Sequence, residues 1–163
     1  MKASPHIFSV VIRLEDAAQT QALGARLGRA LQVGDVIALT GALGAGKTTF
    51  AQGLAAGLGV PAGRPVTSPT FALANEHPGR ISFVHVDFYR IRSSAELPEL
   101  GLEEVFDRAA TAIEWAERFP AYLPADALKV TLEVEPGGAR ILRACSEGPR
   151  GAALLAVLSA SDR

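Results

Sequence analysis

A glycine-rich octapeptide, Gly41-Ala42-Leu43-Gly44-Ala45-Gly46-Lys47-Thr48, closely follows the apolar run Val36-Ile37-Ala38-Leu39. It has glycine at its first and sixth positions and then lysine and threonine, which is the pattern of a phosphate-binding loop. Glycine readily takes a positive φ, so successive backbone N–H groups can point at phosphate oxygens. This phosphate loop, residues 41–48, predicts binding of a nucleoside triphosphate together with a divalent cation.

The segments on either side of the phosphate loop fit this interpretation. Asp35 to Thr40 has the pattern of a buried strand, and Thr48 to Leu58 has that of a helix closed by glycine and proline. The helix would present its positive N-terminal end to the phosphates, with Lys47 as a mobile charge and the Thr48 hydroxyl for the metal. A dinucleotide fingerprint is excluded because the third glycine of GxGxxG is missing. The expected nucleotide contacts are Gly41, Ala42, Leu43, Gly44, Ala45, Gly46, Lys47, Thr48 and Thr49.

Two carboxylates stand where apolar runs end. Asp87 ends the run FVHVD, and Glu114 follows the run AI. Ligands collect at the carboxyl ends of strands in α/β sheets, and magnesium beside a triphosphate needs a carboxylate there. We therefore expect Thr48, Asp87 and Glu114 to bind the metal ion. We expect Asp87, Glu114 and Lys47 to be the catalytic residues. The alternative is that each carboxylate only pairs with a local arginine, Arg90 or Arg118.

A second polar segment, Gly63 to Phe71, contains prolines and several hydroxyl groups, which argue against a regular helix or strand. Its residues Thr67, Ser68, Pro69 and Thr70 resemble a switch segment that becomes ordered on sensing a γ-phosphate. A rigid turn bounded by the prolines explains the same residues. His85 lies inside a predicted strand and is expected to be a buried core imidazole.

The composition limits the classes of protein to which this chain can belong. Its 163 residues suffice for one domain, and 16 Lys and Arg residues nearly balance 17 Asp and Glu residues, for a net charge of −1. A free-standing nucleic-acid binder would carry a basic surplus. The single cysteine, Cys145, excludes an internal disulfide and favours a reducing compartment. The terminal apolar runs are too short for a signal peptide or a membrane span, so we expect one domain, residues 1–163, in the cytoplasm and away from membranes.

Strand and helix patterns alternate in the first half of the chain and give way to hairpins in the second half. Phe8 to Leu14 predicts a strand, and Asp16 starts a helix that precedes the segments around the phosphate loop. Leu128 to Glu135 alternates, and a Gly-Gly turn leads on to predicted strands at Ile141 to Ala144 and Ala152 to Ser159. The pattern predicts an α/β fold. We expect a three-layer, P-loop NTPase-like arrangement with a central mixed sheet, parallel at the phosphate loop and antiparallel toward the C-terminus.

Five segments together resemble the TsaE family, the small bacterial ATPases of tRNA threonylcarbamoyladenosine synthesis. In order they are GALGAGKTT at 41–49, VTSPTF at 66–71, HVDFYR at 85–90, ELGLEE at 99–104 and IEWAER at 113–118. The resemblance covers about residues 14–123. SPT together with EW is far more specific than the phosphate loop alone.

The resemblance implies a function and roles for individual residues. Members of the family bind ATP and Mg²⁺, hydrolyse ATP slowly and work with the TsaB and TsaD proteins. These proteins install threonylcarbamoyl on the adenosine beside the anticodon of tRNAs that read codons beginning with adenine, so we expect contact with tRNA only through the complex. By resemblance, Lys47 and the loop amides hold the phosphates, Thr48 and Glu114 approach the metal, and Asp87 matches the second phosphate-site motif. The family commonly has aspartate where this chain has Ala42, so the loop's mouth lacks that carboxylate.

Other functions use the same loop. A small-molecule or nucleoside kinase would also need an acceptor pocket and usually an arginine-bearing lid, against which the short, acidic segment from Ser93 to Arg108 argues. A regulatory GTPase would need a guanine-reading N-K-x-D segment after the loop. A third alternative is a nucleotide-dependent binding module without relevant turnover. No arginine stands out as an internal finger, so we expect slow ATP hydrolysis by the chain alone. The resemblance implies an ATPase that is accessory to threonylcarbamoyl transfer rather than the transferase itself.

Overall fold

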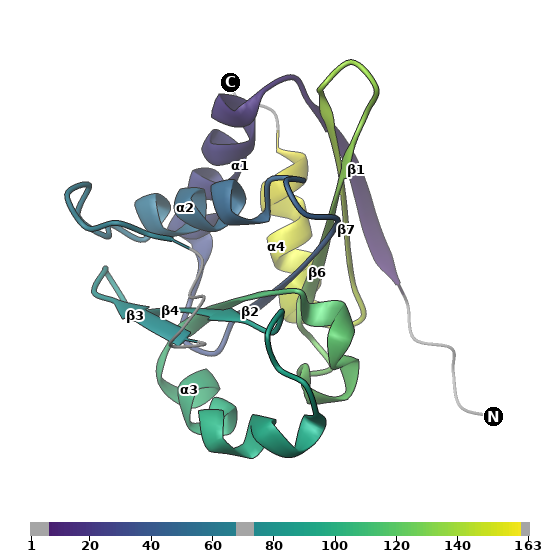
Figure 1. The fold of residues 1–163 in the computed structure, drawn as a ribbon. Helices are drawn as coiled ribbons and strands as arrows, with labels where there is room; N and C mark the ends of the chain where they lie inside the picture. Colours follow the sequence, from purple (N-terminus) through teal and green to yellow (C-terminus); the bar gives the residue numbers. More distant parts are fainter. Residues whose placement is uncertain (1–6, 68–73, 161–163) are drawn as a thin grey trace.

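The computed structural model describes residues 7–67 and 74–160. In these ranges the chain forms one seven-stranded sheet with helices on both faces (Figure 1). The elements in chain order are β1 (Phe8–Leu14), α1 (Ala17–Ala30), β2 (Val36–Thr40), α2 (Lys47–Gly57), β3 (Ala74–His77), β4 (Phe83–Asp87), the 3-10 helix η1 (Ser94–Leu100), α3 (Leu102–Arg108), β5 (Ala110–Glu114), the 3-10 helices η2 (Ala116–Arg118) and η3 (Pro120–Tyr122), β6 (Leu128–Val134), β7 (Arg140–Ser146) and α4 (Pro149–Ser159).

The sheet is mixed, and its strand order is β1-β7-β6-β2-β5-β4-β3. β2 lies between β5 and β6 and runs parallel to both, and β4 runs parallel to β5. β7 pairs antiparallel with β6 and β1, as β3 does with β4. Helices α1, α2 and α4 cover one face, and α3 packs on the other (Figure 1). The predicted three-layer α/β fold, parallel at the phosphate loop and antiparallel toward the C-terminus, is confirmed.

The first two elements form as the sequence predicts. β1 spans Phe8–Leu14, and α1 begins directly after Asp16. The Asp16 carboxylate accepts the backbone N–H of Gln19 at 2.8 Å, and the Gln19 side chain accepts the backbone N–H of Glu15 at 2.8 Å. These two bonds satisfy backbone donors at the start of the helix, which have no acceptor within it.

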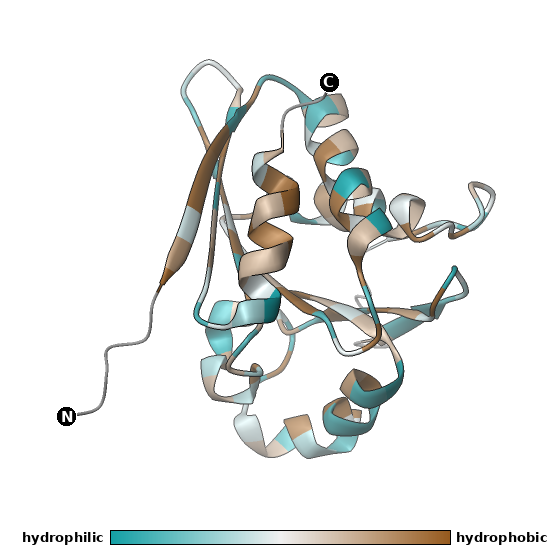
Figure 2. Ribbon diagram, turned by 180° about the vertical axis from the view of Figure 1, so that it is seen from behind, coloured by the Kyte–Doolittle hydropathy of each residue, from teal (hydrophilic) through white to brown (hydrophobic). Residues whose placement is uncertain are grey.

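The predicted last strand, Ala152 to Ser159, is wrong, because Pro149–Ser159 form helix α4. A short apolar run fits a strand or a helix equally well by periodicity. Leu154, Leu155 and Leu158 are all buried in the core between α4 and the sheet, a spacing that places them on one side of a helix. Figure 2 shows the hydrophobic residues along α4. None of the helices in the described ranges has the length and apolar character that crossing a bilayer requires.

Arg150 ties α4 to the segment that precedes β2. Its Nε and Nη2 atoms lie 2.8 and 2.6 Å from the two carboxylate oxygens of Asp35, which is 5% exposed. Nη2 also donates to the carbonyl of Ala30 at the end of α1. The hydrogen bonds to Asp35 raise the pKa of Arg150. This bidentate contact explains why α4 begins beside the start of β2.

Helices α1 and α2 approach each other through glycines. A Cβ placed on Gly28 of α1 would lie 2.3 Å from the Leu54 carbonyl oxygen, and one on Gly57 of α2 would lie 2.1 Å from that of Ala25. Both distances are far below van der Waals contact. Glycine therefore lets the two backbones touch, and this contact places α2 firmly against α1.

We expect Gly28→Ala to lower the free energy of unfolding by about 1–3 kcal/mol, because overpacking costs more than the better helix propensity of alanine returns. Thermal unfolding followed by circular dichroism should show the loss, at roughly 2–4 °C per kcal/mol. Gly137→Ala is the matched control, because a Cβ there meets nothing within 4 Å. Equal melting temperatures for both variants and the parent would contradict the close helix contact.

His77, at the end of β3, is a buried titratable side chain. It is 5% exposed, and neither ring nitrogen has a hydrogen-bond partner within the described ranges. Its ring lies 6.2 Å from that of Phe83, measured between centroids. Burial lowers the pKa of His77, and the nearby His85 and Arg64 lower it further. On acidification the unfolded chain therefore takes up this proton before the folded protein does.

The stability that comes from neutral His77 is complete above the unfolded pKa of about 6.5 and is lost as the pH falls from there toward the lower folded pKa. His77→Phe keeps an aromatic ring against Phe83 and cannot titrate. We expect urea unfolding to show a smaller loss of stability between about pH 7.5 and about pH 5.5 in this variant than in the parent. An equal loss in the two proteins would mean that His77 does not contribute to the pH dependence of stability.

Candidate functional site

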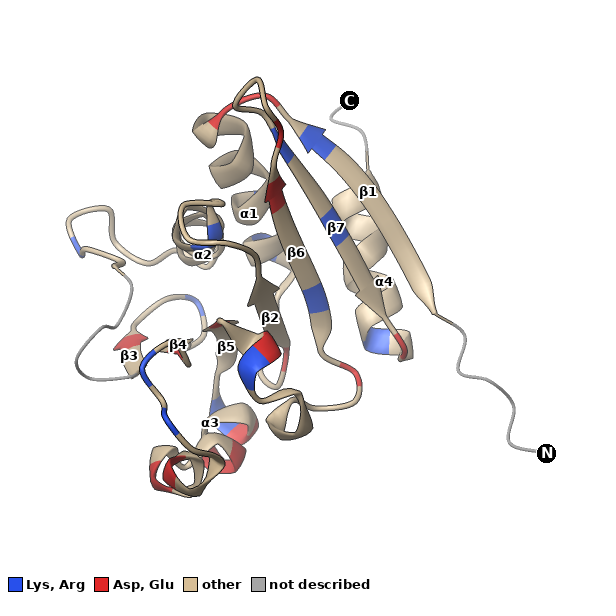
Figure 3. Ribbon diagram, turned by 45° about the vertical axis from the view of Figure 1, so that its right-hand side comes forward, with Lys and Arg blue, Asp and Glu red and all other residues tan. Residues whose placement is uncertain are grey.

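A hollow of about 370 Å³ lies beside the phosphate loop, at the carboxyl ends of β4 and β5. Open α/β sheets hold their ligands at such strand ends. Figure 3 shows β2 leading into the loop that turns back into α2, with β6 beside β2. Of the predicted loop contacts, Gly41, Ala42 and Ala45 do not line the hollow. Its lining residues are Leu43, Gly44, Gly46, Lys47, Thr48, Thr49, Asp87, Tyr89, Arg90, Glu114, Trp115 and Arg140.

The phosphate loop has a backbone conformation that requires glycine. Gly41, Gly44 and Gly46 have φ values of 139°, 78° and 107°, which L side chains rarely adopt. Helix α2 begins directly at Lys47, and no side chain caps it at Gly46. The first N–H groups of a helix have no acceptor within it. A glycine cradle followed by an uncapped helix N-terminus fits a bound phosphate group.

Lys47 is held over the loop rather than extended into solvent. It is 5% exposed, and its Nζ donates to the carbonyls of Gly41 at 2.6 Å and Ala42 at 3.0 Å. Nζ also lies 4.1 Å from the centroid of the Trp115 ring, a cation–π contact. Burial lowers the pKa of Lys47, and the opposing influence of nearby carboxylates comes first from Glu114. The ammonium group is thus held at the loop by contacts within the protein.

Glu114, the last residue of β5, accepts two hydrogen bonds on one oxygen. Its Oε1 lies 2.8 Å from the Thr48 hydroxyl and 2.8 Å from Nε2 of His85. His85 is fully buried, and its Nδ1 has no partner within the described ranges. The sequence predicted Thr48 and Glu114 as site residues, and its prediction that His85 is a buried imidazole is confirmed, but the contact of His85 with Glu114 was not predicted. The missed signal is strand alternation, because His85 is two residues before Asp87 and so faces the same side of β4.

Asp87 lies next to Glu114, because the two residues are in register at the ends of the parallel strands β4 and β5. Asp87 is 6% exposed, and its Oδ1 accepts the backbone N–H of Tyr89 at 2.8 Å. Arg118, a candidate local partner for Glu114, donates instead to the carbonyls of Phe88 and Tyr89. The structure therefore brings both predicted carboxylates to the hollow, beside Thr48 and Lys47.

Trp115 forms part of the rim in an unusual backbone conformation. Its φ is 56°, and it is the only residue other than glycine in the described ranges with positive φ. Its ring lies 4.9 Å from that of Tyr89, measured between centroids. Strained conformations of this kind are maintained by their surroundings and concentrate at functional sites. Here the turn places the indole against the Lys47 ammonium.

The donor set suits a metal ion that is shared with phosphates. No group of three or more His, Cys, Asp or Glu side chains within residues 7–67 and 74–160 could hold a metal by itself. Magnesium beside a nucleotide needs only one or two protein oxygens, because phosphates and water supply the rest. The Thr48 hydroxyl, Glu114 and Asp87 present such oxygens at one end of the hollow, so the residues fit Mg²⁺ in this role.

Only the first residue of the predicted switch-like loop can be placed. Thr67 is exposed, and the preceding Val66 carbonyl accepts a hydrogen bond from Nε2 of Gln52 on α2 at 2.9 Å. The other residues of that loop, Ser68, Pro69 and Thr70, lie outside the described residues. The segment that leads into the loop is therefore attached to the helix that carries Lys47 and Thr48.

Arg140 reaches the site from β7, a part of the chain in which the sequence indicated no functional residue. It lines the hollow and donates to the carbonyls of Gly44 and Ala45. The only local signal is the Gly-Gly turn, which predicts that β7 starts close to residue 140 but does not show that this start lies beside the phosphate loop. Tertiary structure alone reveals this contact.

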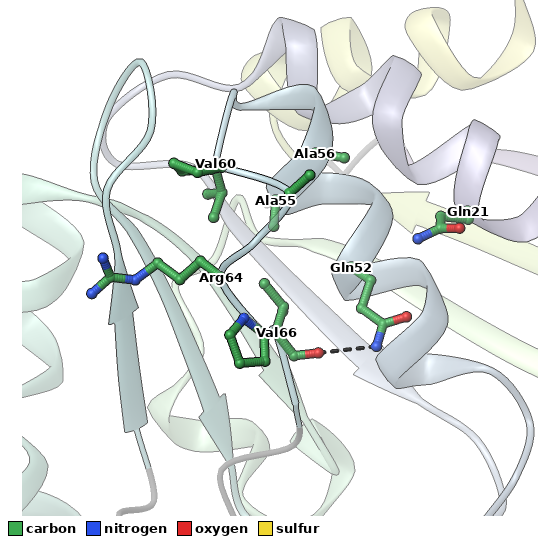
Figure 4. A pocket seen from close by; sticks show the side chains of 10 residues that line it. Gln21, Gln52, Ala55, Ala56, Val60, Arg64 and Val66 are labelled. Atoms are coloured by element: carbon green, nitrogen blue, oxygen red, sulfur yellow. Dashed lines mark hydrogen bonds between the residues drawn. The ribbon is translucent and has the colours of Figure 1, made fainter.

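A second hollow, of about 300 Å³, lies between α2 and the segment that follows it (Figure 4). Alanine, valine and proline form much of its wall, together with Gln21 and Gln52. Arg64 lines it too, but in Figure 4 its guanidinium extends away from both glutamines. This hollow has neither the glycine loop nor the carboxylates of the first, and the candidate functional site is therefore the hollow at the phosphate loop.

Comparison with known proteins identifies the family of this chain. A family model described as "Threonylcarbamoyl adenosine biosynthesis protein TsaE" matches residues 14–142. Proteins named tRNA threonylcarbamoyladenosine biosynthesis protein TsaE are similar to the chain. The one from Treponema pallidum is 40% identical, over 76% of this chain and 91% of its own. The one from Nostoc is 43% identical, over 79% and 81%.

A solved structure has the same fold. It is titled "Crystal structure of Bacillus subtilus YdiB", has a TM-score of 0.82 and is 30% identical to this chain, and the match covers 96% of this chain and 97% of that one. The family match spans both carboxylates, the phosphate loop and Arg140. The chain therefore belongs to the TsaE family of proteins, which take part in tRNA threonylcarbamoyladenosine biosynthesis.

Proposed function

We propose that this chain binds ATP with Mg²⁺ at the phosphate loop, hydrolyses ATP slowly, and acts with the TsaD and TsaB proteins in forming threonylcarbamoyladenosine on tRNA. One observation carries the proposal. At the start of α2, Lys47 lies over a glycine loop while the adjacent Thr48 hydroxyl is hydrogen-bonded to Glu114 at 2.8 Å. A cation, a hydroxyl and a carboxylate thus lie beside one glycine loop, and phosphoryl transfer uses groups of these kinds.

The chemistry of each residue suggests its role in the proposed reaction. The N–H groups at the start of α2 and the Lys47 ammonium would bind the phosphates, since both offer positive charge to oxygen anions. Thr48, Glu114 and Asp87 would hold Mg²⁺, which when bound neutralises charge on the phosphates. Glu114 or Asp87 would orient the attacking water, since the two residues lie opposite each other at the ends of β5 and β4. His85 would keep the Glu114 carboxylate in place by donating from Nε2.

Two arginines near the site, Arg118 and Arg140, contact backbone carbonyls, and this supports slow turnover by the chain alone. Arg118 donates to the carbonyls of Phe88 and Tyr89, and Arg140 donates to those of Gly44 and Ala45. Neither is held as an arginine finger toward a γ-phosphate. A finger supplied by a partner can increase the rate on the order of a thousandfold or more. The proposal is therefore that hydrolysis is stimulated in the assembled complex.

The partner assignment rests on family membership and on charge. Membership of the TsaE family places the chain in tRNA threonylcarbamoyladenosine biosynthesis, and the proposal includes that it works in the cytoplasm. A net charge of −1 argues against direct tRNA binding, so tRNA contact would come through the TsaD and TsaB proteins. A small-molecule or nucleoside kinase would use the same loop. If the protein phosphorylated nucleosides faster than it hydrolysed ATP, a kinase function would replace the proposed one.

Lys47→Ala tests the proposed function directly. We expect it to weaken ATP binding in calorimetry on the order of a hundredfold, because charge-assisted hydrogen bonds to the phosphates are lost. Modified tRNA should then no longer form in a mixture that contains the TsaD and TsaB proteins, tRNA and an activated threonylcarbamoyl donor. Lys129→Ala, an exposed lysine on β6, should leave both measurements unchanged. Unaltered ATP affinity in Lys47→Ala would refute the nucleotide site.

Thr48→Ala and Glu114→Gln test the metal site separately from phosphate binding. We expect each to raise the Mg²⁺ concentration for half-maximal ATP hydrolysis by about tenfold or more, since each removes or weakens a metal-directed oxygen. Binding of ADP in the presence of a chelator should change far less. Glu104→Gln, on the exposed side of α3, is the control. If the magnesium titrations of the two variants match that of the control, Thr48 and Glu114 do not bind the metal ion.

A further inference from the structure

Arg140 approaches the phosphate loop from the side of its carbonyl groups. It is the first residue of β7, and its Nη2 and Nε lie 3.2 Å and 3.4 Å from the carbonyl oxygens of Gly44 and Ala45. Nη1 donates to the carbonyl of Gly138, in the turn that precedes β7. One planar guanidinium thus joins the phosphate loop to the β6–β7 hairpin.

These two carbonyls control the direction of loop amides. In a trans peptide the C=O and N–H groups point in opposite directions, and no cis peptide bond occurs in the described ranges. The Ala45 carbonyl shares its peptide unit with the N–H of Gly46, which is thereby turned away from Arg140. The Gly44 carbonyl shares its unit with the Ala45 N–H, which donates to the Ala42 carbonyl at 3.1 Å and closes the turn.

The tip of the loop has few other contacts that could hold it. Leu43 is 83% exposed, and a Cβ on Gly44 would meet nothing within 4 Å. Ordering a glycine-rich backbone costs conformational entropy, and a ligand that finds the loop already ordered avoids that cost. Arg140, by contrast, has its backbone fixed on both sides, because it is in register with Val134 on β6 and Leu14 on β1.

We propose that Arg140 is a positioning residue that braces the phosphate loop in its phosphate-binding conformation by holding the Gly44 and Ala45 carbonyls. This inference rests on the proposed nucleotide site and deepens it. The brace acts before the nucleotide arrives. It therefore strengthens the binding of every ligand that places a phosphate chain in the loop, and it does not discriminate among bases or between diphosphates and triphosphates.

Two substitutions at this position test the brace. Arg140→Gln removes the charge, whereas Arg140→Lys keeps it but offers one ammonium in place of the fork that spans two carbonyls. In calorimetry we expect Arg140→Gln to weaken binding of ATP, ADP and inorganic tripolyphosphate by similar factors, on the order of tenfold, with Arg140→Lys between it and the parent. Arg143→Gln is the control, since that exposed side chain on the same strand contacts Glu133 at 3.6 Å.

The pattern across the three ligands separates a brace from a direct contact. A loss confined to ATP would make Arg140 a γ-phosphate ligand, and a loss for both nucleotides but not for tripolyphosphate would make it a nucleoside ligand. Either result overturns the inference. Equal affinities in Arg140→Gln and the parent overturn it as well.

Hydrogen exchange in the ligand-free protein gives a second readout that a direct ligand contact would not change. Peptides that cover residues 41–49 should exchange faster in Arg140→Gln than in the parent or in Arg143→Gln, while peptides from β5 and α3 stay unchanged. Unchanged exchange in the loop, or faster exchange throughout the chain, would contradict a local brace.

Lys47→Ala in the same assays distinguishes failure of the brace from failure of the proposed function. If Lys47→Ala loses affinity and Arg140→Gln does not, the nucleotide site stands and the brace is wrong. If Lys47→Ala binds all three ligands like the parent, the nucleotide site is wrong and the brace falls with it.

Discussion

The rest of the site depends on a tight turn between the end of β2 at Thr40 and the start of α2 at Lys47. The backbone makes this turn through three glycines with positive φ, so the constraint is steric. It places the uncapped first turn of the helix at the edge of the sheet where β4 and β5 also end. Lys47 and Thr48 are the first two residues of that helix, and they reach the hollow for this reason.

The neighbouring carboxylates are positioned by sheet register. Parallel pairing of β4 with β5 puts Asp87 opposite Glu114, and strand alternation puts His85 on the same face as Asp87. The Thr48 hydroxyl and the His85 imidazole converge on one Glu114 oxygen, so helix α2 is linked through side chains to two adjacent strands. An unpaired polar group is costly when it is buried, so the two hydrogen bonds to Glu114 favour this arrangement of the site.

Support for the loop comes from parts of the chain that do no chemistry. The glycine contact with α1 fixes α2, and the bidentate pair of Arg150 with Asp35 fixes the approach to β2. The β6–β7 hairpin supplies Arg140 on the carbonyl side of the loop. A glycine-rich loop that is proposed to bind phosphate gains from rigid surroundings, because glycine itself adds no rigidity to the backbone.

The sequence alone determined the features that depend on local geometry: the glycine loop, the strand β1, the start of α1 after Asp16, and the carboxylates at the ends of two strands. These are short-range requirements of backbone conformation and alternation, and they can be recognised without neighbours. Tertiary structure alone decided that residues 149–159 form a helix, that His85 reaches Glu114 and that Arg140 contacts Ala45, 95 positions away. Each of these outcomes depends on which segments come into contact when the sheet is assembled. A local pattern of residues does not show which distant segments will be in contact.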